Sequence, residues 1–490
     1  MLARLALPAA APFFGLVFVV TLLCASRMPI SSDAEMSFRA AQLWLETGSM
    51  ALQPGDFESY ALRPSPDGKR YSKYPLLAFL NCVPAAQLVR HFGDVPLPIG
   101  LLALALVPAA WTALLALGLA LWLARLGFAP RRALGLTALV VVSTPLAIYA
   151  RGYYGEMSQA ALLLWALLLA HTALEDARWA LWAGVLVGLC VGSKATFLVL
   201  VPCVALALPR EGWLRFALGV LPGACLVAAY NYARYQNVFE FGYGSERDGT
   251  LGFGTPLWVG LFGNLLSPGK SLFLYAPLLA LAPFGMQGLV QRQRRFWLLA
   301  WAAPSLALTL IVSTWWAWSG DMAWGPRLLV PIMPWLALPA LLASTRGPAA
   351  WRAALALGAL GVLVQLPALL LSEYEASNHV WRITRPALSM LASKPLDVAD
   401  DGVLLHYVPW LSPVLAQGWL LLAKLFGAAS VGKPPWMGDG FDRLSALPRL
   451  PAWNLWLDDS PLALLLLALL LLAAGGLLLR VLRATEGSRS

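Results

Sequence analysis

The chain has 490 residues, of which 59% are hydrophobic and only 12% are charged. Soluble globular proteins carry about 25% charged residues, so this composition excludes an ordinary soluble domain and predicts an all-α polytopic membrane protein. The net charge of +10 does not indicate a nucleic-acid partner. The basic residues instead form short clusters between apolar runs, as in the cytoplasmic loops of membrane proteins.

Apolar runs of roughly 20 residues predict spanning helices, and we count about twelve of them. They cover residues 8–25, 98–123, 133–149, 157–173, 179–193, 195–209, 214–230, 271–290, 296–313, 327–344, 352–371 and 461–480. We interpret the first run as a retained span, because it is longer than the apolar part of a typical signal peptide. With both termini in the cytoplasm, all but one of the cytoplasmic loops are rich in arginine, as the positive-inside bias requires.

Two mixed apolar segments, 75–93 and 411–428, are predicted to lie at the outer interface rather than to span the bilayer. Residues 179–193 and 195–209 are predicted to turn at Lys194, because a lone lysine at the bilayer centre costs roughly 2.5–3.5 kcal/mol. The chain then divides into a membrane domain, an outer segment of unassigned role, and a last span with its tail. These parts are residues 1–371 (with a first outer loop at 26–97), 372–460 and 461–490.

Two acids follow the first span in the stretch "SSDAEMSFRAAQLWLETGSM". Asp33 and Glu35 are placed at the outer headgroup boundary, and the apolar spacing after them predicts an amphipathic helix. Asp33 as the N-cap of that helix is the structural alternative to a functional role.

Cations are predicted on the same face of the membrane. A carboxylate surrounded by cations suits a lipid with a phosphate head group, because cations bind the phosphate and stabilise its charge as it leaves. The carboxylate can accept a proton from an incoming hydroxyl. Binding of ordinary anionic lipid, or plain solvation, is the alternative for each cation taken singly. The candidates are Lys73, Arg151, Lys194, Lys270 and Arg327.

The loop "WWAWSGDMAWGPR" contains four tryptophans and precedes an apolar run. Anchoring at the membrane interface explains tryptophans there. Stacking on a sugar is the functional alternative, and it makes Trp318, Asp321 and Trp324 candidates for a sugar or acceptor loop. The four histidines lack metal-ligand spacing.

Taken together, these stretches resemble the C-type (GT-C) membrane glycosyltransferases, and in particular the family 39-like branch with protein O-mannosyltransferases and bacterial aminoarabinose transferases. "DAEMSFRAAQLWLETG" resembles the family's two-acid motif, "YSKYPLL" its Lys-Pro-Pro-Leu stretch, and "GLCVGSK" its helix end with a lysine. The likeness covers roughly residues 8 to 345. The Asp-Glu pair of the family is here Asp-Ala-Glu, and one proline is Tyr74.

The resemblance implies inverting transfer of a sugar from a polyprenyl-phosphate donor to a hydroxyl of a lipid, glycan or protein at the outer face of a bacterial inner membrane. Asp33 is then the general base, and Glu35 a second carboxylate that orients the acceptor or a divalent cation (Mg²⁺ or Mn²⁺). Lys73, Lys194 and Arg327 hold the lipid phosphate.

Two alternatives from other classes remain at the level of the sequence. Twelve spans also suit a transporter or a lipid flippase, although such proteins place ionisable sites near the bilayer midplane and often contain two related halves. A non-catalytic assembly or receptor protein with the same fold is the other alternative.

Overall fold

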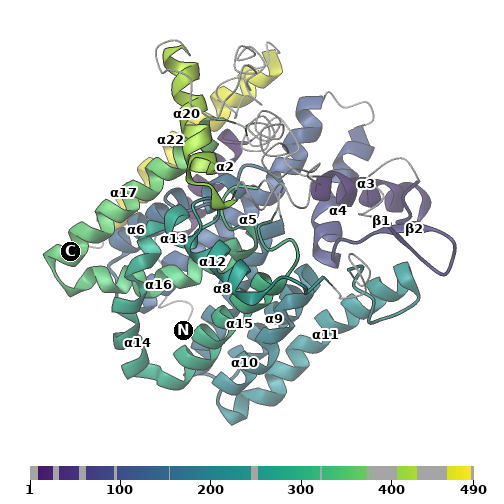
Figure 1. Cartoon of the computed structure of the whole chain (residues 1–490), viewed down its shortest axis with the longest axis horizontal. Helices are drawn as coiled ribbons and strands as arrows, with labels where there is room; N and C mark the ends of the chain where they lie inside the picture. Colours follow the sequence, from purple (N-terminus) through teal and green to yellow (C-terminus); the bar gives the residue numbers. More distant parts are fainter. Residues whose placement is uncertain are drawn as a thin grey trace.

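The structure, a computed structural model, describes residues 9–25, 32–53, 62–92, 97–153, 155–243, 252–320, 323–371, 376, 406–427 and 461–486. These residues are predominantly helical, and Figure 1 shows a helical bundle with α3, α4 and two short strands together on one side. The predicted segment 372–460 lies largely outside the described residues.

The first half of the chain, up to α11, contains the helices and strands of the predicted outer loop. In chain order they are α2 (Ala10–Leu23), α3 (Ser32–Thr47), β1 (Leu62–Pro64), β2 (Arg70–Ser72), α4 (Leu76–Phe92), α5 (Leu97–Arg125), α6 (Pro130–Val142), α7 (Leu146–Tyr149), α8 (Gly155–Ala173), α9 (Trp179–Ser193), η2 (Ala195–Val199), α10 (Leu200–Ala207) and α11 (Arg210–Tyr235).

The second half is more often interrupted by 3₁₀ and π turns. Its elements are α12 (Leu257–Leu266), α13 (Leu272–Tyr275), η3 (Pro277–Leu281), α14 (Ala282–Phe296), η4 (Trp297–Ala302), α15 (Ala303–Thr314), η5 (Arg327–Ile332), α16 (Met333–Ala343), η6 (Ser344–Arg346), α17 (Pro348–Leu370), η7 (Pro409–Leu411), α20 (Pro413–Phe426) and α22 (Pro461–Glu486).

The prediction of an all-α membrane protein agrees with the structure, whereas the count of twelve spans is not confirmed. Within the described residues, six helical stretches are long and apolar enough to cross a membrane. They are Ala103–Arg125, Arg210–Tyr235, Pro277–Thr314, Arg327–Arg346, Pro348–Leu370 and Leu465–Thr485. Several other predicted spans, such as α2 and α9, are shorter apolar helices.

The predicted boundary between spans 271–290 and 296–313 coincides with a break in the structure. The helices of this region form one stretch of 38 residues, Pro277–Thr314. At 1.5 Å per residue a straight helix of this length would exceed the roughly 30 Å apolar core of a bilayer. The helix is instead broken at Gln293, whose φ of −146° and ψ of 61° are not helical.

Helix α8 lies at the centre of the bundle. All of its residues except Gly155, Trp165 and Leu169 are buried, as expected for a helix that is apolar on every side. It packs against α5, α9, η5 and α16. The first turn of α8 therefore lies among the ends of several other helices.

Helices α9 and α11 pack with their backbones in close contact, which small residues permit in membrane proteins. A Cβ on Gly184 would lie 2.2 Å from the carbonyl oxygen of Phe216, and one on Gly219 would lie 2.1 Å from that of Leu181. Only glycine fits at these two positions. This contact fixes Lys194, at the end of α9, relative to α11.

Two predicted local features are confirmed. The helix breaks at Lys194, whose φ of −166° and ψ of 127° are extended, between α9 and η2. The segments 75–93 and 411–428 form helices α4 and α20. Their depth in a bilayer stays a prediction.

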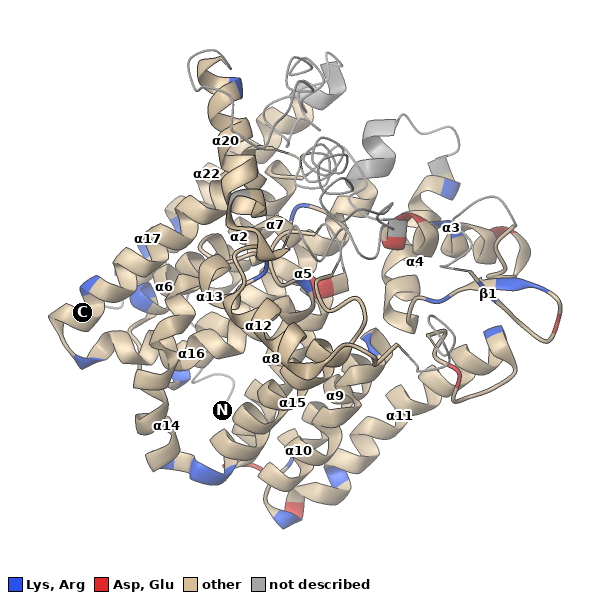
Figure 2. Cartoon of the chain, in the orientation of Figure 1, with Lys and Arg blue, Asp and Glu red and all other residues tan. Residues whose placement is uncertain are grey.

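Charged residues separate between the two ends of the helices. The arginine-rich ends include the start of α11 at Arg210 and the end of α14 at Arg294 and Arg295. Figure 2 shows these basic segments along the lower edge of the bundle, away from α3 and α4. Asp33, Glu156 and Lys194 lie at the other helix ends.

Candidate active site

Asp33 lies in the first turn of α3, which packs against α4. The Tyr74 hydroxyl donates to Asp33 Oδ1 at 2.5 Å, and Arg327 Nη2 donates to Oδ2 at 2.7 Å. Both oxygens thus bind side chains that are distant in the sequence. Helix capping does not explain Asp33, because the residue lies inside the helix and its carboxylate points to other elements.

Arg327 joins the Asp33 carboxylate to a second acid. Its Nε donates to Glu156 Oε1 at 2.7 Å, from the first turn of the buried helix α8. The Asp33 side chain is 34% exposed, whereas those of Arg327 and Glu156 are 15% and 6% exposed. Asp33 is therefore the acid of this pair that an incoming molecule can reach.

Two lysines complete the group. The ammonium of Lys194 interacts electrostatically with Glu156, Arg327 and Asp33. Lys73 interacts with Asp33 in the same way, and its Nζ lies 5.8 Å and 5.7 Å from the ring centroids of Tyr74 and Tyr243.

We call these five residues the Asp33 cluster: Asp33, Lys73, Glu156, Lys194 and Arg327. Three of these residues are cations, and cations favour an anionic ligand.

The Asp33 carboxyl is ionised at neutral pH. Burial raises its pKa, but the adjacent Arg327, the hydrogen bond from Tyr74 and the charge of Lys73 outweigh burial, so the pKa lies below its usual value. Opposite charges and hydrogen bonds to the charged form both favour a carboxylate over a carboxylic acid.

The predicted pairing of Asp33 with Glu35 is corrected by the structure. Positions two apart on an α-helix point about 200° apart around its axis, so they do not face each other. Glu35 is exposed, while Asp33 contacts Arg327 and Tyr74. The described residues also contain no group of three or more His, Cys, Asp or Glu side chains that could hold a metal ion. Asp33 and Glu35 therefore point to different sides of α3, and a role for Mg²⁺ or Mn²⁺ stays a prediction.

Arg151 and Lys270 are not brought into the cluster, so their predicted role in binding phosphate is corrected too. Arg151 donates to the backbone carbonyls of Cys24, Ala368 and Leu369, and Lys270 Nζ donates to that of Ala323 at 2.5 Å. Both side chains are buried. They hold loops and helix ends together.

The predicted sugar-stacking tryptophans are packed inside the protein. Trp318 is 2% exposed and Trp324 is 1% exposed. Trp324 packs edge-on against Tyr275 and donates to Gln365 Oε1 at 2.7 Å. Neither ring has a face available to a sugar. Asp321 lies outside the described residues.

Two residues of the site, Glu156 and Tyr74, were not predicted from the sequence. Glu156 is an acid directly before the long apolar run of α8, and that position was a usable signal, since acids beside spans are costly unless paired. Tyr74 had no signal beyond its neighbour Lys73, because its contact with Asp33 crosses 41 positions of sequence.

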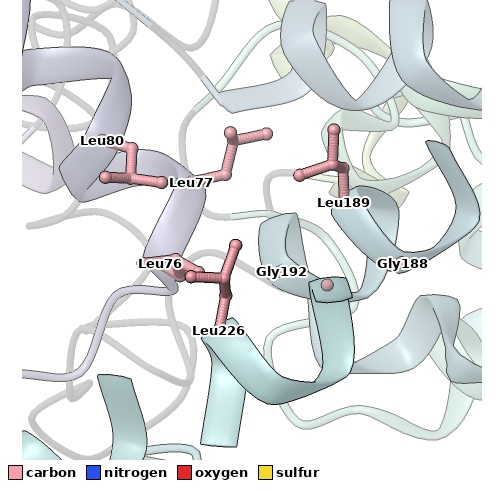
Figure 3. Close-up of a pocket in the computed structure, with 8 residues that line it drawn as sticks. Leu76, Leu77, Leu80, Gly188, Leu189, Gly192 and Leu226 are labelled. Carbon is pink, nitrogen blue, oxygen red and sulfur yellow. The ribbon is translucent and has the colours of Figure 1, made fainter. Parts of the chain in front are cut away.

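An apolar pocket lies beside the cluster, between α4, α9 and α11 (Figure 3). Leucines and glycines line it: Leu76, Leu77, Leu80, Gly188, Leu189, Gly192, Gly223 and Leu226. Leu76 follows Tyr74 by two residues, and Gly192 precedes Lys194 by two. A hydrocarbon surface therefore adjoins the cationic side of the cluster.

No family model and no curated protein matches this chain. Its structural neighbours include two structures of ArnT from Cupriavidus metallidurans, both 16% identical to it. The apo structure matches 84% of this chain and 77% of that one with a TM-score of 0.46. The structure bound to undecaprenyl phosphate matches 86% and 79% with a TM-score of 0.45. The identity and TM-scores are too low to transfer an activity, which has to be inferred from the site.

Proposed function

We propose that this protein is an inverting glycosyltransferase that moves a sugar from a polyprenyl-phosphate donor to a hydroxyl acceptor at the outer face of the membrane. One observation carries the proposal. An accessible carboxylate, Asp33, lies at the ends of apolar helices beside three cations, Lys73, Lys194 and Arg327.

The cations suit the donor phosphate. Lys73 and Lys194 reach the cluster from two sides, one before α4 and one after α9, and Arg327 offers a planar fork of donors to phosphate oxygens. A phosphate leaving a sugar gains negative charge, and fixed cations stabilise that charge in the transition state. Glu156 holds the guanidinium of Arg327 through its Nε.

In the proposed reaction, the acceptor hydroxyl oxygen attacks the anomeric carbon on the face opposite the phosphate. The bond between this carbon and the phosphate oxygen breaks, and its electron pair leaves with the polyprenyl phosphate. Asp33 accepts the hydroxyl proton. A single displacement of this kind inverts the configuration at the anomeric carbon.

Donor binding would also make Asp33 a stronger base. In the free protein Arg327 holds the pKa of Asp33 low, and a low pKa makes a weak base. A bound phosphate competes for the guanidinium of Arg327. Weakening the Asp33–Arg327 pair raises the proton affinity of Asp33 at the moment when it is needed.

The apolar hollow of Figure 3 is too small to enclose an isoprene unit. The proposal therefore places the first part of the polyprenyl chain along the leucine surface of α4, α9 and α11 rather than inside the hollow.

The most direct test combines a deletion strain with the purified protein. Lipid and glycan profiling of the deletion strain should reveal a missing sugar substituent, and the purified protein in lipid nanodiscs should restore it from a polyprenyl-phosphate donor. Unchanged profiles, with no transfer from any donor in a panel of polyprenyl-phosphate sugars, would exclude the proposal. Movement of polyprenyl phosphate across vesicles without sugar transfer would favour the flippase alternative.

A further inference from the structure

The backbone on either side of Lys73 is held by a buried arginine that the proposed reaction does not use. Arg234, near the end of α11, is 2% exposed. Its guanidinium lies 3.8 Å from the ring centroid of Tyr230 and 4.6 Å from that of Tyr235. Two aromatic rings thus fix the plane of the guanidinium.

The guanidinium binds the two residues that flank Lys73. Arg234 Nη1 donates to the carbonyl oxygens of Ser72 at 2.6 Å and Tyr74 at 2.9 Å. Nη2 donates to Asn231 Oδ1 at 3.0 Å, one turn back on the same helix. We call residues 72–74 the strap.

A glycine holds the strap from a second direction. A Cβ on Gly242 would lie 2.9 Å from Lys73 Cα, and its φ of +83° also favours glycine. The carbonyl of Gly242 accepts a hydrogen bond from Arg63 Nε at 2.7 Å, and Arg63 belongs to β1, which pairs with β2 at the start of the strap. The Lys73 backbone is therefore confined between α11 and the segment that follows it.

We infer that Arg234 is a positioning residue of the donor-phosphate site: it fixes the strap so that Lys73 and Tyr74 both reach Asp33. This inference rests on the proposed function. Tyr74 binds Asp33 through its hydroxyl, and Lys73 acts on Asp33 through its charge. Displacing the strap moves both groups at once, without any contact between Arg234 and the substrate.

Lysine cannot fully replace Arg234. Arginine binds the two carbonyls and Asn231 from one rigid plane and stacks on both tyrosines, whereas a lysine ammonium is a compact charge on a flexible stem. The Ser72 carbonyl also accepts from the Tyr235 hydroxyl at 2.9 Å. The Tyr74 carbonyl has a weaker second partner, the Tyr230 hydroxyl at 3.4 Å. We expect the Tyr74 side of the strap to be disturbed most when Arg234 is removed.

The first test measures binding of undecaprenyl phosphate to the full chain in nanodiscs. Arg234→Met should weaken binding about tenfold, because a buried carbonyl loses its charged donor, and Arg234→Lys should weaken it less. Arg215→Met is the matched control, since Arg215 lies exposed on the same helix. In a Lys73→Met background, Arg234→Met should change binding less than about twofold, as expected for coupled residues.

The second test does not depend on the ligand. Hydrogen exchange should become faster in residues 70–76 of Arg234→Met, or of Arg234→Lys if the methionine variant does not fold, and stay unchanged in Arg215→Met. If the wild type binds the lipid, two results would overturn the inference and leave the proposed function standing: unchanged binding by Arg234→Met, or effects of Arg234→Met and Lys73→Met that simply add. If the wild type does not bind the lipid, that result counts against the proposed function. In that case, unchanged hydrogen exchange in residues 70–76 would overturn the positioning role of Arg234 by itself.

Discussion

Helix α8 carries a cluster of polar residues at each end, and the two clusters differ in a way that separates chemistry from architecture. Glu156, in the first turn, belongs to the Asp33 cluster. His171, in the last turn, lies fifteen residues further on, which is about 22 Å along the axis. We call its group the His171 cluster: Arg125, His171, Glu175 and Gln293.

The His171 cluster satisfies its members within the protein. Arg125 donates to His171 Nδ1 and to Glu175, and Gln293 contacts His171 Nε2. Aromatic rings pack around the imidazole, with Phe296 at 4.9 Å and Trp297 at 5.7 Å between centroids. Its arginine is matched by one carboxylate, and Gln293 lies where the long helix breaks. The cluster joins α5, α8 and α14.

The Asp33 cluster, by contrast, contains a carboxylate whose side chain is 34% exposed, beside Arg327 and two lysines. An exposed carboxylate among cations suits the proposed reaction, in which the donor phosphate binds the cations and Asp33 takes the proton. Four variants or conditions test this contrast.

The largest effect is expected for Asp33→Asn. Asparagine keeps the shape, and its amide oxygen can accept from Arg327 while its NH₂ group donates to the Tyr74 hydroxyl, but it cannot take a proton. Sugar transfer should fall by about 10²–10⁴-fold while the protein stays folded in detergent. His171→Gln should leave transfer intact. Transfer by Asp33→Asn at the wild-type rate would remove Asp33 from the role of base.

Arg327→Met should have the next largest effect. It removes the guanidinium that donates to the buried Glu156, and loss of one partner of a buried pair costs about 3–5 kcal/mol. Both thermal stability and binding of undecaprenyl phosphate should decline. Arg327→Lys should recover part of the stability and less of the binding, because a lysine cannot reach Asp33 and Glu156 at once. Intact lipid binding by a folded Arg327→Met protein would contradict a role in holding phosphate.

Arg125→Met tests the opposite end of α8. It removes the donor to buried His171, and an unsatisfied buried polar group costs about 1–3 kcal/mol. Thermal stability should fall by that amount, and the rate of transfer per folded molecule should not change. A selective loss of transfer would break the contrast between the two clusters.

The smallest effect is expected from acidification. The pKa of Asp33 in the folded protein lies below its usual value, so its ionic contribution to stability is present above the unfolded pKa and disappears as the pH falls through the folded pKa. The stability difference between wild type and Asp33→Asn, measured by thermal unfolding, should be constant from pH 7 to about pH 5 and shrink below about pH 4. A difference that vanished near pH 6 would mean that the pKa of Asp33 is raised.

The parts of the site that could be predicted are charged residues beside apolar runs, because burying such a charge without a partner costs free energy. Lys194 interrupts an apolar run, and the structure breaks the helix there. Asp33 follows a span and begins an amphipathic helix, and the structure has α3 at that place. Arg151 and Lys270 also lie beside apolar runs, yet their side chains donate to backbone carbonyls. A sequence shows that a cation needs a partner, but it does not show which partner.

One span boundary was predictable because polar residues mark it. The run QRQRR at residues 291–295 separates two apolar segments, and the structure breaks the helix there, at Gln293. The placement of the tryptophans in the loop at 315–324 was wrong. Composition places tryptophan at an interface, whereas packing against Tyr275 and Gln365 buries Trp324.

The sequence by itself determined that the chain is a membrane protein and where several of its helices end. Both depend on residues that are only a few positions apart, because apolar runs transfer into a bilayer and charged residues are excluded from it. Only the tertiary structure decided that Arg327 joins Asp33 to Glu156, across 294 and 171 positions of the chain. Such pairs depend on how helices pack. Here the glycine contacts of α9 with α11 and the buried position of α8 bring one set of charges together and leave Glu35, Arg151 and Lys270 out of it.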